Sequence, residues 1–141
     1  MYPKNVIQYL TQWIAENNNA AYNWLVENNY PELVAMAAAL YEDDNNGDPP
    51  SLEWLKQKNK FILVAFVKSV RENKDAFKWL IANKQFIWAA VANAVNKDEG
   101  AKKWLLNNRF EHYAKLAEKI KEKFDKEDHS DLDFLIKGPI R

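Results

Sequence analysis

Residues 76–95 read AFKWLIANKQFIWAAVANAV, and the pattern of this stretch recurs four times along the chain. Its marker is a Trp-Leu pair, with a small residue three positions before the Trp and an Asn or Lys four positions after it. Successive Trp residues are 30, 25 and 25 positions apart. Internal repeats of this length are typical of stacked helical units, each too small to bury its apolar face alone. The four pairs are Trp24 and Leu25, Trp54 and Leu55, Trp79 and Leu80, and Trp104 and Leu105.

Downstream of each pair, the apolar residues follow the period of an α-helix. At nine, twelve, thirteen and sixteen positions after the Trp, all four copies carry an apolar or aromatic residue, with no gap in the alignment. In the third copy these residues are Trp88, Val91, Ala92 and Val95. Offsets of three, four and seven place side chains on one face of a helix. Each copy therefore predicts a short helix A, which contains the Trp-Leu pair, and a longer helix B, which contains the apolar stripe.

We expect the four Trp-Leu pairs to form the structural core of the repeats. An isolated helix of about eight residues is unstable in water, so each helix A has to pack its Trp and Leu on neighbours. On this reasoning, replacing one of the Trp residues by Ala costs roughly 3–5 kcal/mol. Asn-rich joints separate helix A from helix B, and Asn both caps helices and tolerates the left-handed conformation. Asp75 and Asp98 are expected to cap the third and fourth A helices.

The predicted fold class is all-α: a short α/α-solenoid-like, right-handed stack of helix pairs, with about nine helices in one domain. It resembles α-solenoids in architecture, the class that contains armadillo, HEAT and tetratricopeptide repeats, although the period is shorter and their signature residues are absent. Polar residues 125–131 are expected to end the last helix. The apolar tail then folds back over the last repeat or serves as a linear motif for a partner. The predicted segments are a cap helix at 3–17, repeats at 21–50, 51–75, 76–100 and 101–125, and a tail at 126–141.

The charges are unevenly distributed, although the chain as a whole is neutral. Residues 1–53 carry a net charge of −7, residues 54–109 carry +8 and residues 110–141 carry −1. Such asymmetry is compatible with a polyanion-binding surface, with head-to-tail self-association, or with a solvated lysine-rich face. The residues proposed for polyanion binding are Lys56, Lys58, Lys60, Lys68, Arg71, Lys74, Lys78 and Lys84.

Residues 42–53 half-match a calcium-binding loop. Two prolines, Pro49 and Pro50, stand where such a loop needs a strand-like residue. The alternative is a polar connector in which Ser51 caps the next helix. The residues at calcium-loop spacing are Glu42 at position 1, Asp44 at 3, Asn46 at 5, Gly47 at 6 and Glu53 at 12.

We expect no enzymatic activity, no cofactor and no metal site. The chain has no Cys, three Gly and two His, so thiol chemistry and a glycine-rich phosphate loop are excluded. The run from His129 to Asp131 is contiguous, whereas a catalytic triad needs residues that converge in space. No run of 18 apolar residues predicts a membrane span. Residues 1–5 do not resemble a signal peptide, so we expect a cytoplasmic location.

Three functions follow as hypotheses from this organisation. The first is a non-enzymatic scaffold for protein–protein interaction, because stacked helix pairs create an extended surface for peptides or domains. The alternative is nucleic-acid binding, in which the lysine-rich second and third repeats contact the phosphate backbone. Self-assembly between the acidic N-terminal part and the basic middle of another copy is a third option, and the oligomeric state stays open.

Overall fold

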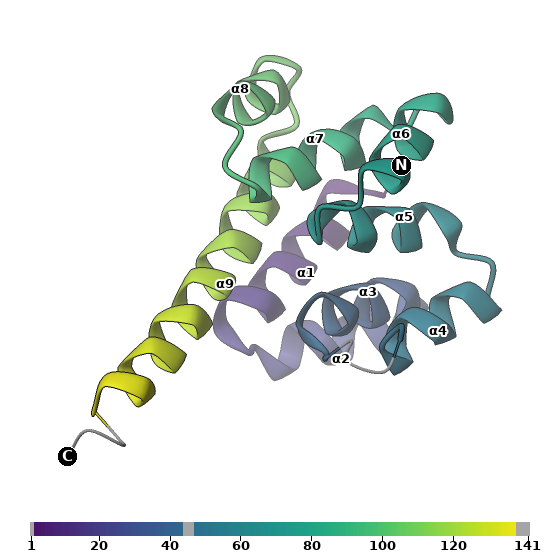
Figure 1. The fold of residues 1–141 in the computed structure, drawn as a ribbon. Helices are drawn as coiled ribbons and strands as arrows, with labels where there is room; N and C mark the ends of the chain where they lie inside the picture. Colours follow the sequence, from purple (N-terminus) through teal and green to yellow (C-terminus); the bar gives the residue numbers. More distant parts are fainter. Residues whose placement is uncertain (1, 44–46, 138–141) are drawn as a thin grey trace.

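The computed structural model describes residues 2–43 and 47–137, with side chains through residue 126. Within these ranges the chain forms nine helices and no strand, which confirms the all-α class (Figure 1). None of the helices in the described ranges is both long enough and apolar enough to cross a membrane. The helices are α1 (Lys4–Glu16), α2 (Asn19–Glu27), α3 (Pro31–Tyr41), α4 (Pro50–Gln57), α5 (Phe61–Val70), α6 (Lys74–Ala82), α7 (Phe86–Val95), α8 (Glu99–Asn107) and α9 (Glu111–Lys137).

The helices after α1 alternate between short and long in the order that the sequence pattern predicts. The A helices are α2, α4, α6 and α8, and the B helices are α3, α5, α7 and α9. Every stripe position of the B helices is buried in all four repeats, because offsets of three, four and seven face the same side of a helix. These residues are Leu33, Met36, Ala37, Leu40, Leu63, Phe66, Val67, Val70, Trp88, Val91, Ala92, Val95, Tyr113, Leu116, Ala117 and Ile120.

All four A helices end in the same way. In each, the residue five positions after the Trp has a left-handed backbone, and the next backbone N–H donates to the carbonyl of the Leu in the pair. This arrangement satisfies carbonyl groups that the helix end would leave without a partner. The prediction of left-handed Asn holds at Asn29 and Asn59, but the equivalent residues of the last two repeats are Lys84 and Arg109. In the first, third and fourth repeats the Asn before the left-handed residue also caps the helix end, since its side-chain amide donates to the Trp carbonyl, at 2.8 Å for Asn28 and Asn83 and at 2.7 Å for Asn108.

The N-terminal caps were predicted correctly for one of the two A helices. Asp98 accepts a hydrogen bond from the Ala101 N–H at 3.2 Å, as expected of a cap. The prediction for Asp75 is wrong, because Asn73 caps α6 through the Ala76 N–H at 3.0 Å. The left-handed residue Glu72 ends the preceding helix, so the next helix starts two residues earlier than the sequence pattern indicated. Asp75 then lies in the first turn of α6.

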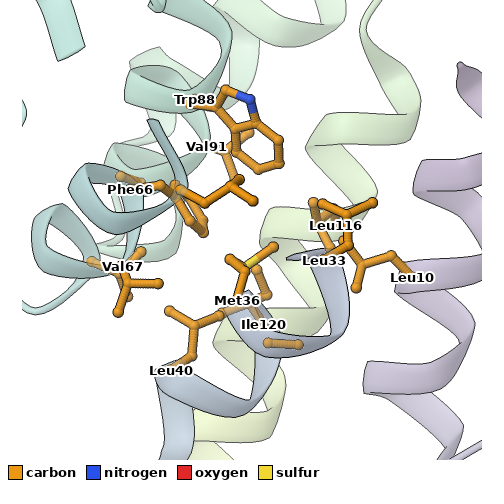
Figure 2. Close-up of a cluster of buried hydrophobic side chains, with 14 of the residues drawn as sticks. Leu10, Leu33, Met36, Leu40, Phe66, Val67, Trp88, Val91, Leu116 and Ile120 are labelled. Carbon is orange, nitrogen blue, oxygen red and sulfur yellow. The ribbon is translucent and has the colours of Figure 1, made fainter. Parts of the chain in front are cut away.

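The B helices and α1 surround one shared core. Each of these helices contacts the next one, in the order α1, α3, α5, α7 and α9. The last of them, α9, packs against α1, so the five helices form a closed circuit. Figure 2 shows side chains from all five helices pointing toward a common centre, among them Leu10, Met36, Phe66, Val91 and Leu116. The Tyr41 hydroxyl also donates to the Ile120 carbonyl at 3.1 Å, which links α3 to α9. The leading helix therefore does more than cap the first repeat, since it joins the first repeat to the last.

The last helix is longer than predicted. Residues 125–131 do not end it, because α9 continues to Lys137. Polar residues such as Lys and Glu are good helix formers, and no Gly or Pro occurs between Glu111 and Gly138. Figure 1 shows the C-terminal part of α9 extending beyond the other helices. The tail's predicted side-chain contacts with the last repeat fall outside the described residues.

Candidate functional site

The two members of each Trp-Leu pair have different environments. Leu25, Leu55, Leu80 and Leu105 are fully buried. The prediction that all four Trp residues belong to the core is wrong for Trp79 and Trp104, each of which is 39% exposed, while Trp24 and Trp54 are half-buried. Adjacent residues on a helix point about 100° apart, so the side of helix A that faces the core accepts the Leu but only part of the Trp. Trp79 and Trp104 each lie at the seam with the preceding repeat.

The aromatic residues around the first Trp explain why it is better covered than the later ones. The Tyr9 ring of α1 stacks on Trp24 with ring centroids 4.2 Å apart and an interplanar angle of 18°. Tyr30 stacks on the same indole at 6.2 Å. Trp104 stacks only on Phe110 of its own repeat, at 6.1 Å, among the ring pairs of the described residues. The later indoles therefore keep a face that a binding partner can reach.

A cavity of about 510 Å³ opens beside Trp79 at the seam between the second and third repeats. We call it cavity 1. Leu63 and Trp88, both buried, form part of its wall. Phe61, the first residue of α5, also lines it and is 50% exposed. The cavity therefore combines a hydrophobic wall with aromatic side chains that solvent can reach. Its full lining is Tyr2, Asn59, Lys60, Phe61, Ile62, Leu63, Trp79, Gln85 and Trp88.

A second apolar cavity, cavity 2, lies at the next seam and has a volume of about 440 Å³. Phe86 lines it together with Trp104, so cavity 2 repeats the relation between Phe61 and Trp79: the first residue of a B helix lies near the Trp of the next A helix. Ile81 also lines it, and both Ile81 and Phe86 are more than 40% exposed. Scattered exposed apolar residues are normal, but a clustered set beside cavities is typical of a binding surface. We define the aromatic surface as Phe61, Trp79, Ile81, Phe86 and Trp104.

Tyr2 gives the wall of cavity 1 a fixed, neutral hydroxyl. Its ring meets Trp88 edge-on, with centroids 6.3 Å apart, and its hydroxyl donates to Glu32 Oε2 at 3.1 Å. Burial raises the pKa of Tyr2 well above its usual value, and the nearby Glu32 carboxylate raises this pKa further. Tyr2 therefore stays protonated at neutral pH and adds no charge to cavity 1.

Three of the eight residues proposed for polyanion binding are engaged within the protein. Lys56 and Lys68 both pair with Asp48, the second of them at 3.8 Å. The hydrogen bond from Lys56 lowers the pKa of Asp48, so this carboxylate stays ionised. Arg71 Nη2 donates to the carbonyls of Ala39, at 2.7 Å, and of Glu42, also at 2.7 Å, near the end of α3. Lys56 and Lys68 thus tie Asp48 to α4 and α5, and Arg71 ties the end of α3 to the end of α5.

The other five basic residues are exposed, and they fall into two groups. Lys58 and Lys60 lie at the joint between α4 and α5, and Lys84 lies at the joint between α6 and α7. Lys74 and Lys78 lie on α6. Lys60 lines cavity 1, and Lys84 precedes the lining residue Gln85. Within the described part of the chain none of these five lysines forms an ion pair, although the Lys58 Nζ lies 5.8 Å from the centre of the Trp54 ring on α4. Lys60, together with Lys84 next to the lining residue Gln85, gives cavity 1 a basic rim.

The structure uses two residues of the half-matched calcium loop for another purpose. The Glu42 carboxylate accepts hydrogen bonds from the Ser51 N–H at 2.9 Å and from the Ser51 hydroxyl at 2.8 Å. Glu42 thus satisfies a donor in the first turn of α4, where a negative charge is favourable. Ser51 is not the cap residue expected from sequence, because α4 already begins at Pro50. Asp44 and Asn46 lie outside the described residues.

A polar cavity of about 570 Å³ lies between α1 and α9. His112 and Glu111 line it from α9, and Lys4 and Thr11 line it from α1. His112 Nδ1 is buried and has no hydrogen-bond partner within the described residues. Burial lowers the pKa of His112, Lys4 lowers it further, and Glu111 acts in the opposite direction. Among the described residues as a whole, no three His, Asp or Glu side chains converge as metal ligands would.

Neither a protein-family model, nor a curated protein, nor a solved structure matches the chain. The aromatic surface is therefore identified from the structure of this chain alone. Sequence reasoning did not single out Phe61 or Phe86, because they lie outside the stripe. Both stand seven positions after a Trp, where the other two repeats have Pro31 and Glu111. A large apolar residue at a position where other repeats carry Pro or Glu indicates an exposed apolar side chain, and this comparison could have identified Phe61 and Phe86 from the sequence.

Proposed function

We propose that this chain is a non-enzymatic helical-repeat scaffold that binds another protein through the aromatic surface. In this proposal the four units form a short right-handed stack of the α-solenoid type, in which the seams between repeats supply the binding sites. The observation that supports it is the exposure of two equivalent Phe and Trp pairs, Phe61 with Trp79 and Phe86 with Trp104, each beside an apolar cavity.

The chemistry of the aromatic surface favours a protein ligand. Trp and other large aromatic residues dominate the energy of protein interfaces, because they bury much area in well-packed pockets. Cavities of several hundred Å³ with apolar walls and a few polar groups are suited to receiving such anchor residues from a partner. Two cavities at successive seams would bind two anchors of one partner, which provides specificity without a large interface.

Nucleic-acid binding is the second candidate, and the exposed lysines beside aromatic rings favour it. Proteins that bind single strands combine a basic groove with aromatic rings on which bases stack. We rank this function second because Lys56, Lys68 and Arg71 are engaged within the protein, which leaves fewer cations for phosphates. A titration against single-stranded and duplex oligonucleotides at about 50 and 200 mM salt tests it, since phosphate binding weakens steeply over this range.

Site-specific photo-crosslinking in the native cell tests the proposed scaffold function. A photoreactive phenylalanine analogue would replace Phe61 or Phe86, and Asn23 on α2 would carry the same analogue as the matched control, since Asn23 is exposed and lies on another repeat. We expect one discrete protein adduct from positions 61 and 86 and none from position 23. The proposal would be overturned if positions 61 and 86 gave only the pattern of position 23.

The cytoplasm is part of the same proposal. The absence of Cys from the sequence supports a reducing compartment, where disulfides do not form. Fractionation of the native cell, followed by detection of the chain, tests the location.

A further inference from the structure

We propose that residues 127–136 of a second copy of this chain bind in cavity 1, so that the protein assembles head to tail. This inference rests on the proposed function, because it names an occupant for one part of the aromatic surface. Three observations carry it: the charge and apolar content of the C-terminal segment, the basic rim of cavity 1, and the direction in which α9 leaves the rest of the structure.

The sequence of the segment is complementary to cavity 1. Residues 127–136 contain four acids and no Lys or Arg. They also contain Leu132, Phe134, Leu135 and Ile136, which are the kind of apolar anchors that a cavity with a hydrophobic wall accepts. The acids alternate with the first apolar residues, as in Asp131, Leu132, Asp133 and Phe134.

The rim of cavity 1 supplies the opposite charge. Lys60 lines the cavity and Lys84 immediately precedes the lining residue Gln85, whereas the Lys58 Nζ lies over the Trp54 ring on α4. Lys60 and Lys84 are exposed and form no ion pair with a described residue. Attraction between an acidic segment and a basic rim speeds encounter and fixes the register, while the apolar anchors supply most of the affinity. Cavity 2 is a poorer match, because Asp98 lines it.

The placement of α9 requires that the segment come from another copy. α9 packs against α1, α7 and α8, and its C-terminal end lies far from α5 and α6 in Figure 1. A chain could place residues 127–136 in its own cavity 1 only by breaking α9. A second copy can do so with α9 intact. The donor segment and the acceptor cavity are different surfaces, so the contact is heterologous and adds further copies in the same direction.

Sedimentation analysis of the full chain over a concentration series tests this proposal. We expect the wild-type mass to rise with protein concentration, and to rise less steeply at about 0.5 M salt, which screens the charge pairing. The cavity variant is Lys60→Glu with Lys84→Glu, and the tail variant is Asp133→Lys with Phe134→Ser. Each variant alone should associate at least tenfold more weakly than the wild type.

A mixture of the two variants gives the decisive result. The cavity variant keeps an intact tail and the tail variant keeps an intact cavity, so together they can form one good contact. We expect the equimolar mixture to form a dimer that does not extend further. The matched control is Lys97→Glu with Lys103→Glu, which changes the net charge equally at exposed lysines outside cavity 1. The equivalent residue to Lys97 in the preceding repeat is Glu72, which has the same left-handed conformation, so this control should fold and associate normally.

Three outcomes would overturn the inference, and they also separate it from the proposed function. A wild-type chain that stays monomeric at about 1 mM has no such contact, whereas a protein adduct at position 61 would still support the scaffold. Assembly that neither variant weakens uses another surface. If the cavity variant weakens assembly and the tail variant does not, cavity 1 is part of the interface but residues 127–136 are not its occupant. Far-UV circular dichroism confirms that each variant is folded.

Discussion

Two neighbouring leucines on α8 offer a matched test of how the repeat is stabilised. Leu105 is the Leu of the fourth Trp-Leu pair and is fully buried, whereas Leu106 is 43% exposed. Replacement by Ala removes the same three carbon atoms at either position and changes helix propensity equally. Any difference between the two variants therefore reports the environment of the side chain. We expect Leu105→Ala to be much the more damaging.

The expected losses follow from burial. Three carbons transferred out of a core cost about 2.4 kcal/mol at about 0.8 kcal/mol each. The space left behind at a fully enclosed site raises the total, so we expect Leu105→Ala to lower the free energy of unfolding by about 3–4 kcal/mol. The Leu106 side chain is already roughly half exposed to solvent, so its replacement loses only about half of the transfer free energy and leaves no closed cavity. The expected loss is therefore about 1 kcal/mol.

Urea unfolding followed by far-UV circular dichroism measures both variants. With a slope of about 1.5 kcal/mol per molar urea, Leu105→Ala should lower the midpoint by about 2 M, and Leu106→Ala by less than about 1 M. The slope should stay the same for both, which shows that the unfolded state is unchanged. Equal losses at the two positions would refute the assignment of the Leu to the shared core.

The remaining predictions concern polar contacts. Glu42→Ala should lower the free energy of unfolding by about 1 kcal/mol in the same assay, since the Ser51 N–H in the first turn of α4 loses its acceptor, while Glu42→Gln should lose less. Arg71→Met should cost about 2 kcal/mol, because carbonyls at the end of α3 lose a charged donor; an unchanged midpoint would contradict this role. The lowered pKa of His112 means that below pH 6.5 the unfolded chain binds this proton more readily than the folded chain, so wild-type stability should fall as the pH drops from 6.5 through the folded-state pKa. His112→Gln should flatten that part of a stability–pH profile measured by urea unfolding, and an unchanged profile would show that other groups cause the fall.

The sequence was sufficient for the features that depend on local periodicity. The stripe through Trp88 and Val91 predicted a buried helix face, because only the 3.6-residue period is needed to place those side chains together. The alternation of short and long helices followed from the same spacing. The start of α6 was misplaced, because both Asn73 and Asp75 are good caps and the choice depends on where the preceding helix ends.

Features set by neighbours in space could not be predicted in this way. The exposure of Trp79 depends on what covers it, and the sequence around Trp24 looks the same although Tyr9 covers that indole. The pairing of Lys56 and Lys68 with Asp48 requires Asp48, just before α4, to lie near both α4 and α5. The contact of α1 with α9 joins the two ends of the chain, and no local pattern encodes which distant helices meet.

That contact limits how the protein can evolve and how it can lose its structure. In an open array of repeats, duplication lengthens the chain without disturbing the units already present, and a terminal unit can fray alone. Here a fifth unit would have to separate α1 from α9, so gene duplication should be tolerated only with loss of their shared packing. For the same reason the first unit and the last unit both depend on α1, so neither can fray alone.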